Sequence, residues 1–487
     1  MDRPNVVLIM TDTQSKRMVG AYGEPAFRTP NLDRLAAAGV RFERAYTACP
    51  LCTPARGSIF SGMMPSNHGA WANEMSPQRH VPLMGEVVRA LGCRAGYTGK
   101  WHLDGAGYHG AGNPDGGFEP DWWYDGKRYL DDIGGMNRLK QFIQNRQDAA
   151  KLREVGCTIE DIWGHRVADR AIDFLRQVND DPFVLAVSFD EPHGPFVVPP
   201  EFADAVNPDA LPERPNYNAS LEGKPAGHRE QAVQFPCPDW RTHARERLPH
   251  WNCNAYVDYE IGRVIDAVRE LHGDDTYIIY TADHGDMMGS HGLRSKGAMM
   301  YEETTNIPLL IAGPGIEPGQ ESGALVSHLD LLPTILGWMG ESTPAYAHGR
   351  DIGALLADPS AEVRETVTVQ FNRFGLYHHG QYGLVPIRCT MDSRYKLVVN
   401  LWDTDELYDL REDPYEMTNR IDDPALAEHR DRLHDAMLDE MYAICDPFRG
   451  DQWRNRPWRE GAVHTDYFHQ PTLDPPEGLI HGRPPNW

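Results

Sequence analysis

The stretch "NVVLIMTD" (residues 5–12) decides the class of fold. After Asn5 it is a continuous apolar run, and it ends at the polar pair Thr11 and Asp12. Short continuous apolar runs are typical of strands that are buried on both faces. Such strands belong to parallel sheets that carry helices on both sides. The stretch therefore predicts an α/β protein whose buried first strand ends at an acidic residue.

Further strands and helices alternate after this first strand. The predicted strands are 5–10, 40–46, 93–98, 183–189, 276–281 and 307–312. The predicted helices, recognised by capping residues or by apolar residues at helical spacing, are 29–39, 81–91, 159–178 and 248–271. This alternation predicts a large, mostly parallel sheet flanked by helices.

The pattern changes after about residue 365. Strands of an antiparallel sheet are predicted at "TVTVQFN" (366–372), "GLVPIRC" (383–389) and "YKLVVN" (395–400). Residues 423–443 are expected to form a helix on that sheet, and the tail from Cys445 is expected to wrap over the body of the protein. We therefore predict an α/β domain over residues 1–365 and a smaller C-terminal domain over residues 366–487.

The charge of the chain limits its partners. Its 487 residues carry a formal net charge of −24, with 41% hydrophobic and 24% charged residues, an ordinary globular composition. A negative field repels nucleic acid and anionic membrane surfaces, so neither is expected as a partner. It also repels anionic substrates. An anion site in this chain therefore needs its own cluster of cationic side chains or a metal ion.

The first residues of the chain and its cysteines indicate the cellular compartment of the protein. The opening "MDRPNVVLIMTD" has no basic leader and no small-residue cleavage site, so no signal peptide is predicted. No apolar run approaches the roughly 18 residues of a membrane span. The eight cysteines form no regular framework and are expected to be reduced thiols. These features predict a cytoplasmic protein.

Four polar motifs follow predicted strands. They are "TDT" (11–13), "GKWH" (99–102), "EPHGPF" (191–196) and "ADHGD" (282–286). Functional residues of open α/β sheets gather at the carboxyl ends of the strands, so the motifs are expected to form one composite site. Asp12, Asp283 and His284 are its candidate metal ligands. The structural alternative for Asp12 is a helix or turn cap.

Two cysteines in "ACPLCTPARGSIFSG" (48–62) allow several interpretations. A structural zinc site needs four ligands, and no second Cys or Cys/His pair accompanies Cys49 and Cys52. A thioredoxin-like site is a second possibility, although no redox fold is recognisable around it. The simplest alternative is a pair of small buried hydrophobic residues. The residues that follow Cys52 favour a fourth interpretation.

The motif around Cys52 resembles the signature of an enzyme family. Cys52-Thr53-Pro54-Ala55-Arg56, followed by Ser61-Gly62, matches C-x-P-x-R…(S/T)-G, which is the signature of the type I sulfatases in the alkaline phosphatase superfamily. The resemblance extends over most of the chain, through Asp12, "TPNLDRLAAAGVRFERAY", "GKWH", "PHGPF", "ADHGD" and "ELYDLREDPYEMTN". It implies a large α/β domain and a small domain with an antiparallel sheet. It also implies that a maturation enzyme oxidises Cys52 to formylglycine, an aldehyde.

The aldehyde provides a way to release the product. Hydrated formylglycine is a gem-diol, and one hydroxyl attacks sulfur while the alcohol or amine leaving group departs. The second hydroxyl then loses its proton, the C–O bond to sulfate breaks, and the aldehyde returns. A serine in its place would form a stable ester that water would have to attack at sulfur.

The resemblance also implies a metal site. One divalent metal is expected at Asp12, Thr13, Cys52, Asp283 and His284, with calcium as the first choice and manganese or zinc as alternatives. Family members often carry a second acid in place of Thr13, and many have Asn in place of His284. The imidazole makes this site less purely calcium-like.

Five residues besides Cys52 are expected to act in catalysis. Arg56 matches the family arginine that holds the diol and the metal-bound carboxylates; its structural alternative is a surface salt bridge. Lys100 and His102 point the same way if the chain there is extended, which suits sulfate binding and proton transfer. His193 is expected to bind sulfate or to protonate the leaving group. Lys296 matches a family lysine that contacts sulfate and the leaving oxygen.

The substrate is less defined by the sequence. Asn73, Trp101 and His291 are further candidates for substrate contact, and the aromatic, acidic segment 104–135 is expected to shape the pocket entrance. A sulfated sugar, an aryl sulfate, an alkyl sulfate such as choline sulfate and a sulfamate all fit this pattern. The oligomeric state does not follow from the sequence.

Two other functions fit part of the pattern. Phosphonate monoester or phosphodiester hydrolases of the same superfamily can use formylglycine and carry an Asp–His pair without a second acid, so Thr13 and His284 favour them. The motif "GKWH" argues against them, because its Lys and His are commonly absent there. A catalytically inactive carbohydrate-binding relative would have lost its nucleophile or metal ligands, whereas Cys52, Asp12 and Asp283 are present.

Overall fold

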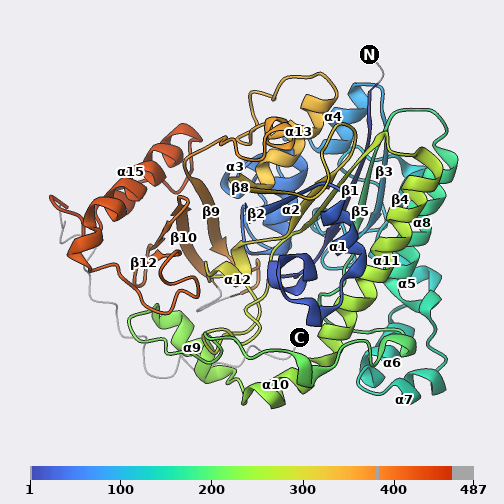
Figure 1. The fold of residues 1–487 in the computed structure, drawn as a ribbon, viewed down its shortest axis with the longest axis horizontal. Helices are drawn as coiled ribbons and strands as arrows, with labels where there is room; N and C mark the ends of the chain where they lie inside the picture. Colours follow the sequence, from blue (N-terminus) through green and yellow to red (C-terminus); the bar gives the residue numbers. More distant parts are fainter. Residues whose placement is uncertain (1–2, 379–382, 463–487) are drawn as a thin grey trace.

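An eight-stranded sheet forms the centre of the computed structural model, which describes residues 3–378 and 383–462 (Figure 1). The order across this sheet is β4-β3-β5-β1-β6-β7-β2-β8. The strands are β1 (Asn5–Thr11), β2 (Val40–Tyr46), β3 (Arg94–Gly99), β4 (Trp123–Tyr124), β5 (Phe183–Ser188), β6 (Thr276–Ala282), β7 (Leu309–Ala312) and β8 (Gln320–Ser327). The first strand of the chain therefore lies in the interior of the sheet.

The sheet is mostly parallel, which confirms the predicted class of fold. Val7 of β1 lies opposite Leu185 of β5 on one side and Ile278 of β6 on the other, and both pairings are parallel. β7 is the exception, because it runs antiparallel to both β6 and β2. As a result, the chain leaves β6 and enters β7 at the same edge of the sheet.

Helices cover both faces of this sheet (Figure 1). The helices that precede the small sheet in the chain are α1 (Pro30–Ala37), α2 (Cys52–Ser61), α3 (Pro65–His68), α4 (Met84–Ala90), α5 (Gly126–Asp132), α6 (Met136–Asn145), α7 (Ala149–Glu154), α8 (Trp163–Gln177), α9 (Ala226–Gln234), α10 (Trp240–Glu246), α11 (Leu248–His272), α12 (Glu302–Thr305), α13 (Leu331–Trp338) and α14 (Gly353–Ala357), and some of them, such as α9, lie away from the large sheet. The helices predicted at 29–39, 81–91, 159–178 and 248–271 correspond to α1, α4, α8 and α11.

The side chains of β1 alternate between the two faces. Val7 and Ile9 pack in one apolar cluster with α8 and α11, whereas Val6, Leu8 and Met10 pack in the other with α4 and α13. Each of these five side chains is fully buried, and such burial contributes about 1.5–3 kcal/mol for a large aliphatic residue. Helices on both faces therefore explain why the first strand is apolar throughout.

A second sheet with four antiparallel strands follows. Its order is β12-β11-β10-β9, formed by β9 (Val367–Arg373), β10 (Leu384–Met391), β11 (Tyr395–Asn400) and β12 (Glu406–Asp409). One face packs against α15 (Ala427–Ala443), with Leu397 and Val399 meeting Leu433 and Met437. The opposite face packs against Tyr46 and Leu51 at the edge of the large sheet.

The C-terminal helix begins later than predicted. Residues 423–443 were expected to be helical, but α15 begins at Ala427. The side chain of Asp423 accepts a hydrogen bond from the N–H of Ala425 and caps a short 3₁₀ turn, Pro424–Leu426. The Asp-Pro pair therefore forms its own turn before the helix starts.

The predicted tail is described only in part. After α15 the chain forms α16 (Asp451–Arg454), and Trp453 is fully buried in the cluster beneath α15. Residues 463–487 of that tail lie outside the described residues. Within the described ranges, no helix combines the length and the apolar character needed to cross a membrane.

Candidate active site

The predicted polar motifs meet at one edge of the large sheet. β3, β5, β1 and β6 are adjacent parallel strands, so their carboxyl ends lie side by side. Lys100 follows β3, Asp190 lies just after β5, Asp12 follows β1 and Asp283 follows β6. The connection from β6 to the antiparallel β7 stays at this edge and carries Lys296. The topology thus brings four segments together.

Cys52 lies among these strand ends as the first residue of α2. The residue is 2% exposed. Its Sγ lies 2.9 Å from Lys296 Nζ, 3.3 Å from His284 Nε2 and 3.7 Å from Asp12 Oδ1. A cysteine at a helix N-terminus and beside cations has the surroundings of a reactive thiol.

The two cysteines of the CxxC pattern differ in environment. Burial and Asp12 act to raise the pKa of the unmodified Cys52 thiol, but nearby cations led by Lys296 outweigh them and lower that pKa to about 6. Cys49 packs in the apolar cluster beneath the small sheet, and burial raises its pKa well above the ordinary value. Neither cysteine forms a disulfide. The two environments therefore indicate a reactive Cys52 and an inert Cys49. They do not support a redox pair formed by these two cysteines.

Four side chains form a cluster of potential metal ligands. Asp12, Cys52, Asp283 and His284 each offer one ligand atom, and these atoms all lie within 4.8 Å of one another. All four residues are buried. Two carboxylates, an imidazole and a sulfur are donors that divalent cations accept. The donor set therefore fits a divalent metal.

Thr13 borders this cluster through hydrogen bonds. Its hydroxyl donates to Asp12 Oδ1 at 2.6 Å and accepts from Lys296 Nζ at 3.0 Å. Its backbone N–H donates to Asp283 Oδ1 at 3.1 Å. The residue has a φ of 63°, a left-handed conformation that is uncommon for a β-branched residue and is typical of functional sites. Thr13 thus orients two of the candidate ligands.

Arg56 links the carboxylates from two strand ends. Its Nη2 lies 3.0 Å from Asp12 Oδ2, and its Nε lies 3.1 Å from Asp283 Oδ2. Its Nη1 donates to the hydroxyl of Ser188 at 2.7 Å. All three charged side chains are fully buried, so the surface-salt-bridge alternative for Arg56 is wrong. A buried arginine with this many partners holds the acidic groups in fixed positions.

Lys100 is also fully buried at this edge. Its Nζ lies 2.8 Å from Asp12 Oδ2 and 3.0 Å from Asp190 Oδ1. It also lies 4.0 Å from the centre of the Tyr108 ring, within the range of a cation–π contact. Burial alone would lower the pKa of Lys100, but Asp12 and Asp190 raise it, so this side chain is a permanent cation.

The two candidate histidines are neutral in this surrounding. Burial, Lys100 and Arg56 lower the pKa of His102 to about 3. Burial and the two nearby lysines likewise lower the pKa of His193 well below its ordinary value. His193 Nε2 lies 4.0 Å from Asp12 Oδ1. Two neutral imidazoles near Lys100 and Asp12 can accept or relay a proton.

The extended conformation expected for "GKWH" is wrong. His102 has a φ of 59°, so the chain turns out of the strand direction at this residue. β3 has already ended at Gly99, where the backbone approaches Ser188 too closely for any side chain. Lys100 and His102 therefore reach the site because the chain turns there, and not through the side-chain alternation of a strand.

Sequence reasoning missed two residues of the site. The hydroxyl of Tyr108 donates to Asp190 Oδ1 at 2.5 Å and lies 2.8 Å from His193 Nδ1. Asp190 precedes the motif "EPHGPF" by one residue and could have been included as an acid at a strand end. Tyr108 lies in the glycine-rich segment "GAGYHG", and no spacing signal in the sequence identifies it.

Two of the three expected substrate contacts point elsewhere. Trp101 is 1% exposed and packs edge-on against Tyr97, 4.9 Å between ring centres, because its side chain turns away from that of Lys100 into the core. His291 is 1% exposed and stacks on Tyr301 at 4.4 Å, a contact within the connection that carries Lys296. Both side chains thus pack within the protein, and substrate contact by either of them stays a prediction.

Asn73 supports the site from beside the cysteine. Its Oδ1 accepts a hydrogen bond at 3.1 Å from the backbone N–H of Thr53, the residue after Cys52. The residue is 8% exposed. In this position Asn73 holds the first turn of α2 in place.

Solved structures share this architecture. A phosphonate monoester hydrolase of Agrobacterium radiobacter superposes with a TM-score of 0.75 at 22% identity, covering 91% of this chain and 96% of its own. A protein solved in complex with its substrate D-glucosamine-2-N,6-O-disulfate superposes with a TM-score of 0.73 at 20% identity, covering 94% and 100%. At these identities the likeness shows a shared class of fold, a large, mostly parallel sheet with a smaller antiparallel sheet.

Sequence relatives define the family within that class. The Sulfatase family model matches residues 4–341, and the model for N-sulphoglucosamine sulphohydrolase, C-terminal, matches residues 289–442. A protein of Escherichia coli (strain K12), "Uncharacterized sulfatase YidJ", is 40% identical over 473 residues, which cover 95% of this chain and 92% of the relative. The chain belongs to the sulfatase family and is a sulfuric ester hydrolase.

Proposed function

We propose that the enzyme hydrolyses sulfate esters through a formylglycine made from Cys52. The observation that carries this proposal is the position of Cys52 between a cluster of metal ligands and Lys296, whose Nζ lies 2.9 Å from Sγ. Maturation replaces the thiol with an aldehyde, and hydration of the aldehyde gives two hydroxyls on one carbon. The nucleophile then lies where cations surround the incoming sulfate.

The reaction proceeds in two steps with balanced atoms. In the first, one hydroxyl oxygen loses its proton and bonds to sulfur, the bond from sulfur to the leaving oxygen or nitrogen breaks, and the leaving group takes that proton. In the second, the remaining hydroxyl gives up its proton, its oxygen forms the carbonyl, and the C–O bond to sulfate breaks. Water then hydrates the aldehyde again. Sulfate and an alcohol or amine are released.

The charged residues have different roles in these two steps. Lys100 and Lys296 hold sulfate oxygens, and Arg56 holds the carboxylates of Asp12 and Asp283 in place through one ion pair to each. Burial raises the pKa of Asp12, but Lys100, Lys296 and other cations outweigh it and lower that pKa well below the ordinary value, so this carboxylate stays available as a ligand. Each role follows from a contact already made in the folded chain.

Two histidines are assigned to proton transfer. His102 accepts the proton of the second hydroxyl when sulfate leaves. His193 takes up the proton that the attacking hydroxyl releases and passes it to the leaving group, and Tyr108 orients its ring through the contact at Nδ1. Because both rings are neutral at rest, each can accept a proton without first losing one.

Asp12, Asp283, His284 and the modified Cys52 would hold one divalent metal, with Thr13 orienting the first two. Calcium is the first choice because the carboxylates are hard oxygen ligands; His284 makes manganese or zinc acceptable. When bound, the metal lowers the pKa of the diol and polarises a sulfate oxygen. The maturation enzyme is the one protein partner that this mechanism requires.

A second candidate is hydrolysis of phosphonate monoesters or phosphodiesters. His284 among the metal ligands and Thr13 in place of a second acid favour it. Lys100 argues against it, because this lysine is commonly absent from such hydrolases. In this chain it is present, and its ammonium contacts Asp12 and Asp190 at the site. A comparison of kcat/KM for phenyl sulfate and for a phenylphosphonate ester separates the two. The inactive carbohydrate-binding alternative is disfavoured by the complete set of nucleophile and ligands.

The formylglycine is tested in the tryptic peptide "AYTACPLCTPAR" (45–56). In the matured enzyme it should lack one sulfur and two hydrogens and carry one additional oxygen, with the change at Cys52. Cys49 should still alkylate, and a hydrazide should label the peptide. Cys52→Ser should give at most a single turnover, because a serine ester lacks the second hydroxyl. Full multiple turnover by protein with unmodified Cys52 would refute the proposal.

A further inference from the structure

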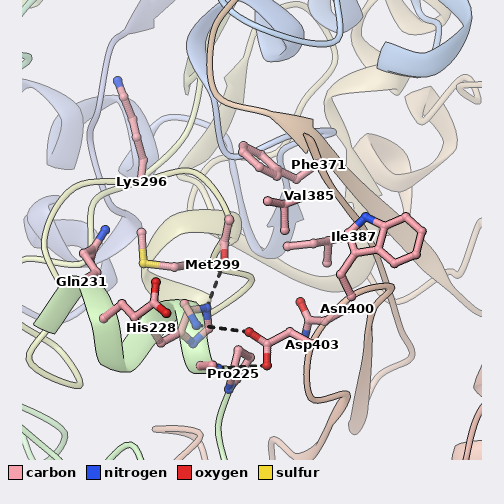
Figure 2. A pocket seen from close by; sticks show the side chains of 15 residues that line it. Pro225, His228, Gln231, Lys296, Met299, Phe371, Val385, Ile387, Asn400 and Asp403 are labelled. Carbon is pink, nitrogen blue, oxygen red and sulfur yellow. Dashed lines mark hydrogen bonds between the residues drawn. The ribbon is translucent and has the colours of Figure 1, made fainter. Parts of the chain in front are cut away.

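A cavity of about 250 Å³ lies between α9 and the small sheet, next to the active site. Figure 2 shows Gln231 and Met299 on one side of it and Phe371, Val385 and Ile387 on the other. Most of the side chains around it are apolar. The cavity is therefore a place where part of a ligand can leave water.

Lys296 joins this cavity to the reaction centre. The residue lines the cavity, whereas its Nζ lies 2.9 Å from Cys52 Sγ. Figure 2 shows the ammonium directed away from the other labelled residues. The length of one lysine side chain thus separates the cavity from the sulfur. A substrate whose sulfate is held at Cys52 reaches the cavity only with a leaving group that extends beyond its first ring.

Trp402 provides an aromatic surface at this cavity. The residue belongs to the connection between β11 and β12, lines the cavity and is 64% exposed. An indole that exposes this much surface beside an apolar cavity can stack on the face of an aromatic or pyranose ring. The same stacking would remove apolar surface of Trp402 from water.

The charges around the cavity disfavour a substrate that carries another anionic group in addition to the reacting sulfate. Lys296 is the one Lys or Arg among its described lining residues, and its ammonium is engaged with Cys52 and Thr13. Glu230 also lines the cavity and is exposed, and Asp403 adds a second carboxylate that accepts N–H groups of α9. A sulfate or carboxylate on the distal part of a substrate would face these acids without a cation.

We propose that this cavity binds the distal, uncharged ring of the substrate's leaving group, which stacks on Trp402. The inference rests on the proposed function and narrows its substrate class. The substrates are sulfate esters whose leaving group has at least two rings and carries no anion on the second ring. An aryl group and a neutral sugar share this chemistry, and the experiment distinguishes them.

The test compares substrates that differ in length and charge. We expect kcat/KM of the matured enzyme to be roughly tenfold higher for biphenyl-4-yl sulfate than for phenyl sulfate, the gain expected from one stacked ring. A carboxylate on the distal ring should remove this gain. A neutral disaccharide monosulfate compared with its monosaccharide monosulfate forms the sugar series. The series with the larger gain identifies the natural type of ring.

Variants assign the gain to the cavity. Trp402→Ala should reduce the two-ring to one-ring ratio to near one in the series that shows the gain. Glu230→Lys should raise kcat/KM for the carboxylated substrate severalfold. Tyr377→Ala is the matched control, because this side chain is 82% exposed and does not line the cavity, and it should keep the wild-type ratio.

The outcomes separate this inference from the function on which it rests. Sulfate ester turnover with the same ratio in wild type and Trp402→Ala overturns the cavity assignment alone. A gain that the carboxylate does not remove overturns the charge argument. Absence of turnover on every sulfate ester, in protein whose Cys52 is shown to be an aldehyde, overturns the proposed function as well.

Discussion

The ammonium of Lys296 lies 2.9 Å from the sulfur of Cys52, although 244 residues separate them in the chain. α2 places Cys52 at the carboxyl edge of the sheet, and the antiparallel β7 keeps the preceding connection at that edge. The cation is therefore in position before a substrate arrives. Groups that need no rearrangement stabilise developing charge more effectively than groups that must move.

Asp283→Ala should remove the metal while the protein stays folded. The variant loses one carboxylate of the four-residue ligand cluster, so elemental analysis should find less than a tenth of the wild-type metal, and turnover should fall about 10³-fold or more. In the wild type, chelation should lower Tm, because ligands that bind only the native state stabilise it. An unchanged rate and Tm after chelation, with no metal in purified protein, would contradict the site.

Lys100→Ala should weaken the binding of the sulfate group at the reaction centre. The side chain contacts Asp12 and Asp190 and is a permanent cation at the reaction centre, so its loss should lower kcat/KM by roughly 10²-fold or more. Steady-state kinetics on an aryl sulfate measures this. Lys127→Ala removes an exposed lysine and serves as the control. Near wild-type kinetics for Lys100→Ala would mean that this lysine has only a structural role. That result would favour the alternative function, hydrolysis of phosphonate monoesters or phosphodiesters.

His102→Ala should affect the second chemical step. If this ring accepts the proton that releases sulfate, sulfated enzyme should accumulate while the leaving group still departs in a burst. Mass spectrometry of the quenched enzyme should detect the added sulfate on the peptide that contains Cys52. A slow variant without burst or adduct would place His102 in the first step instead.

Tyr108→Phe tests a residue that the sequence did not reveal. The substitution keeps the ring beside Lys100 but removes the hydroxyl that joins Asp190 to His193. We expect kcat to fall roughly tenfold with little change in KM, because hydrogen bonds to charged groups contribute about 1.5–3 kcal/mol. The effect should be largest for poor leaving groups, which depend most on protonation. Equal losses for good and poor leaving groups would mean that Tyr108 acts only through packing.

His434 should contribute to acid unfolding. Burial lowers its pKa to about 4, and its Nε2–H donates to the carbonyl of Trp453 at 2.7 Å. In the unfolded chain this imidazole takes up a proton near pH 6.5. Its contribution to the free energy of unfolding is therefore present above about pH 6.5 and is lost as the pH falls toward 4. The loss amounts to up to about 3 kcal/mol.

The matched variants are His434→Gln and His80→Gln, the latter at an exposed histidine. Urea unfolding midpoints at pH 7 and pH 5 measure the effect. His434→Gln should be less stable than wild type at pH 7 but should lose less stability between the two pH values. His80→Gln should follow the wild type. Parallel pH dependence in all three proteins would show that His434 is not the titrating group.

The large sheet and its reactive edge could be predicted from local patterns. The apolar run at residues 5–10 demands burial on both faces, and the acid after it belongs at the carboxyl end of a strand. The residues after Cys52 identify the family, and the same local logic predicts Asp283 after β6. These features depend on neighbours in the chain, which is why a sequence reveals them.

Tertiary structure alone decided which side chains face the site. Lys100 and Trp101 are adjacent, yet the turn after Gly99 sends the first to Asp12 and the second into the aromatic core. Tyr108 joins the site through a glycine-rich loop whose path depends on packing and not on periodicity. The cavity beside Trp402 exists because α9 meets the small sheet there. Such long-range contacts depend on loop conformations and on the burial of distant surfaces, which no local pattern records.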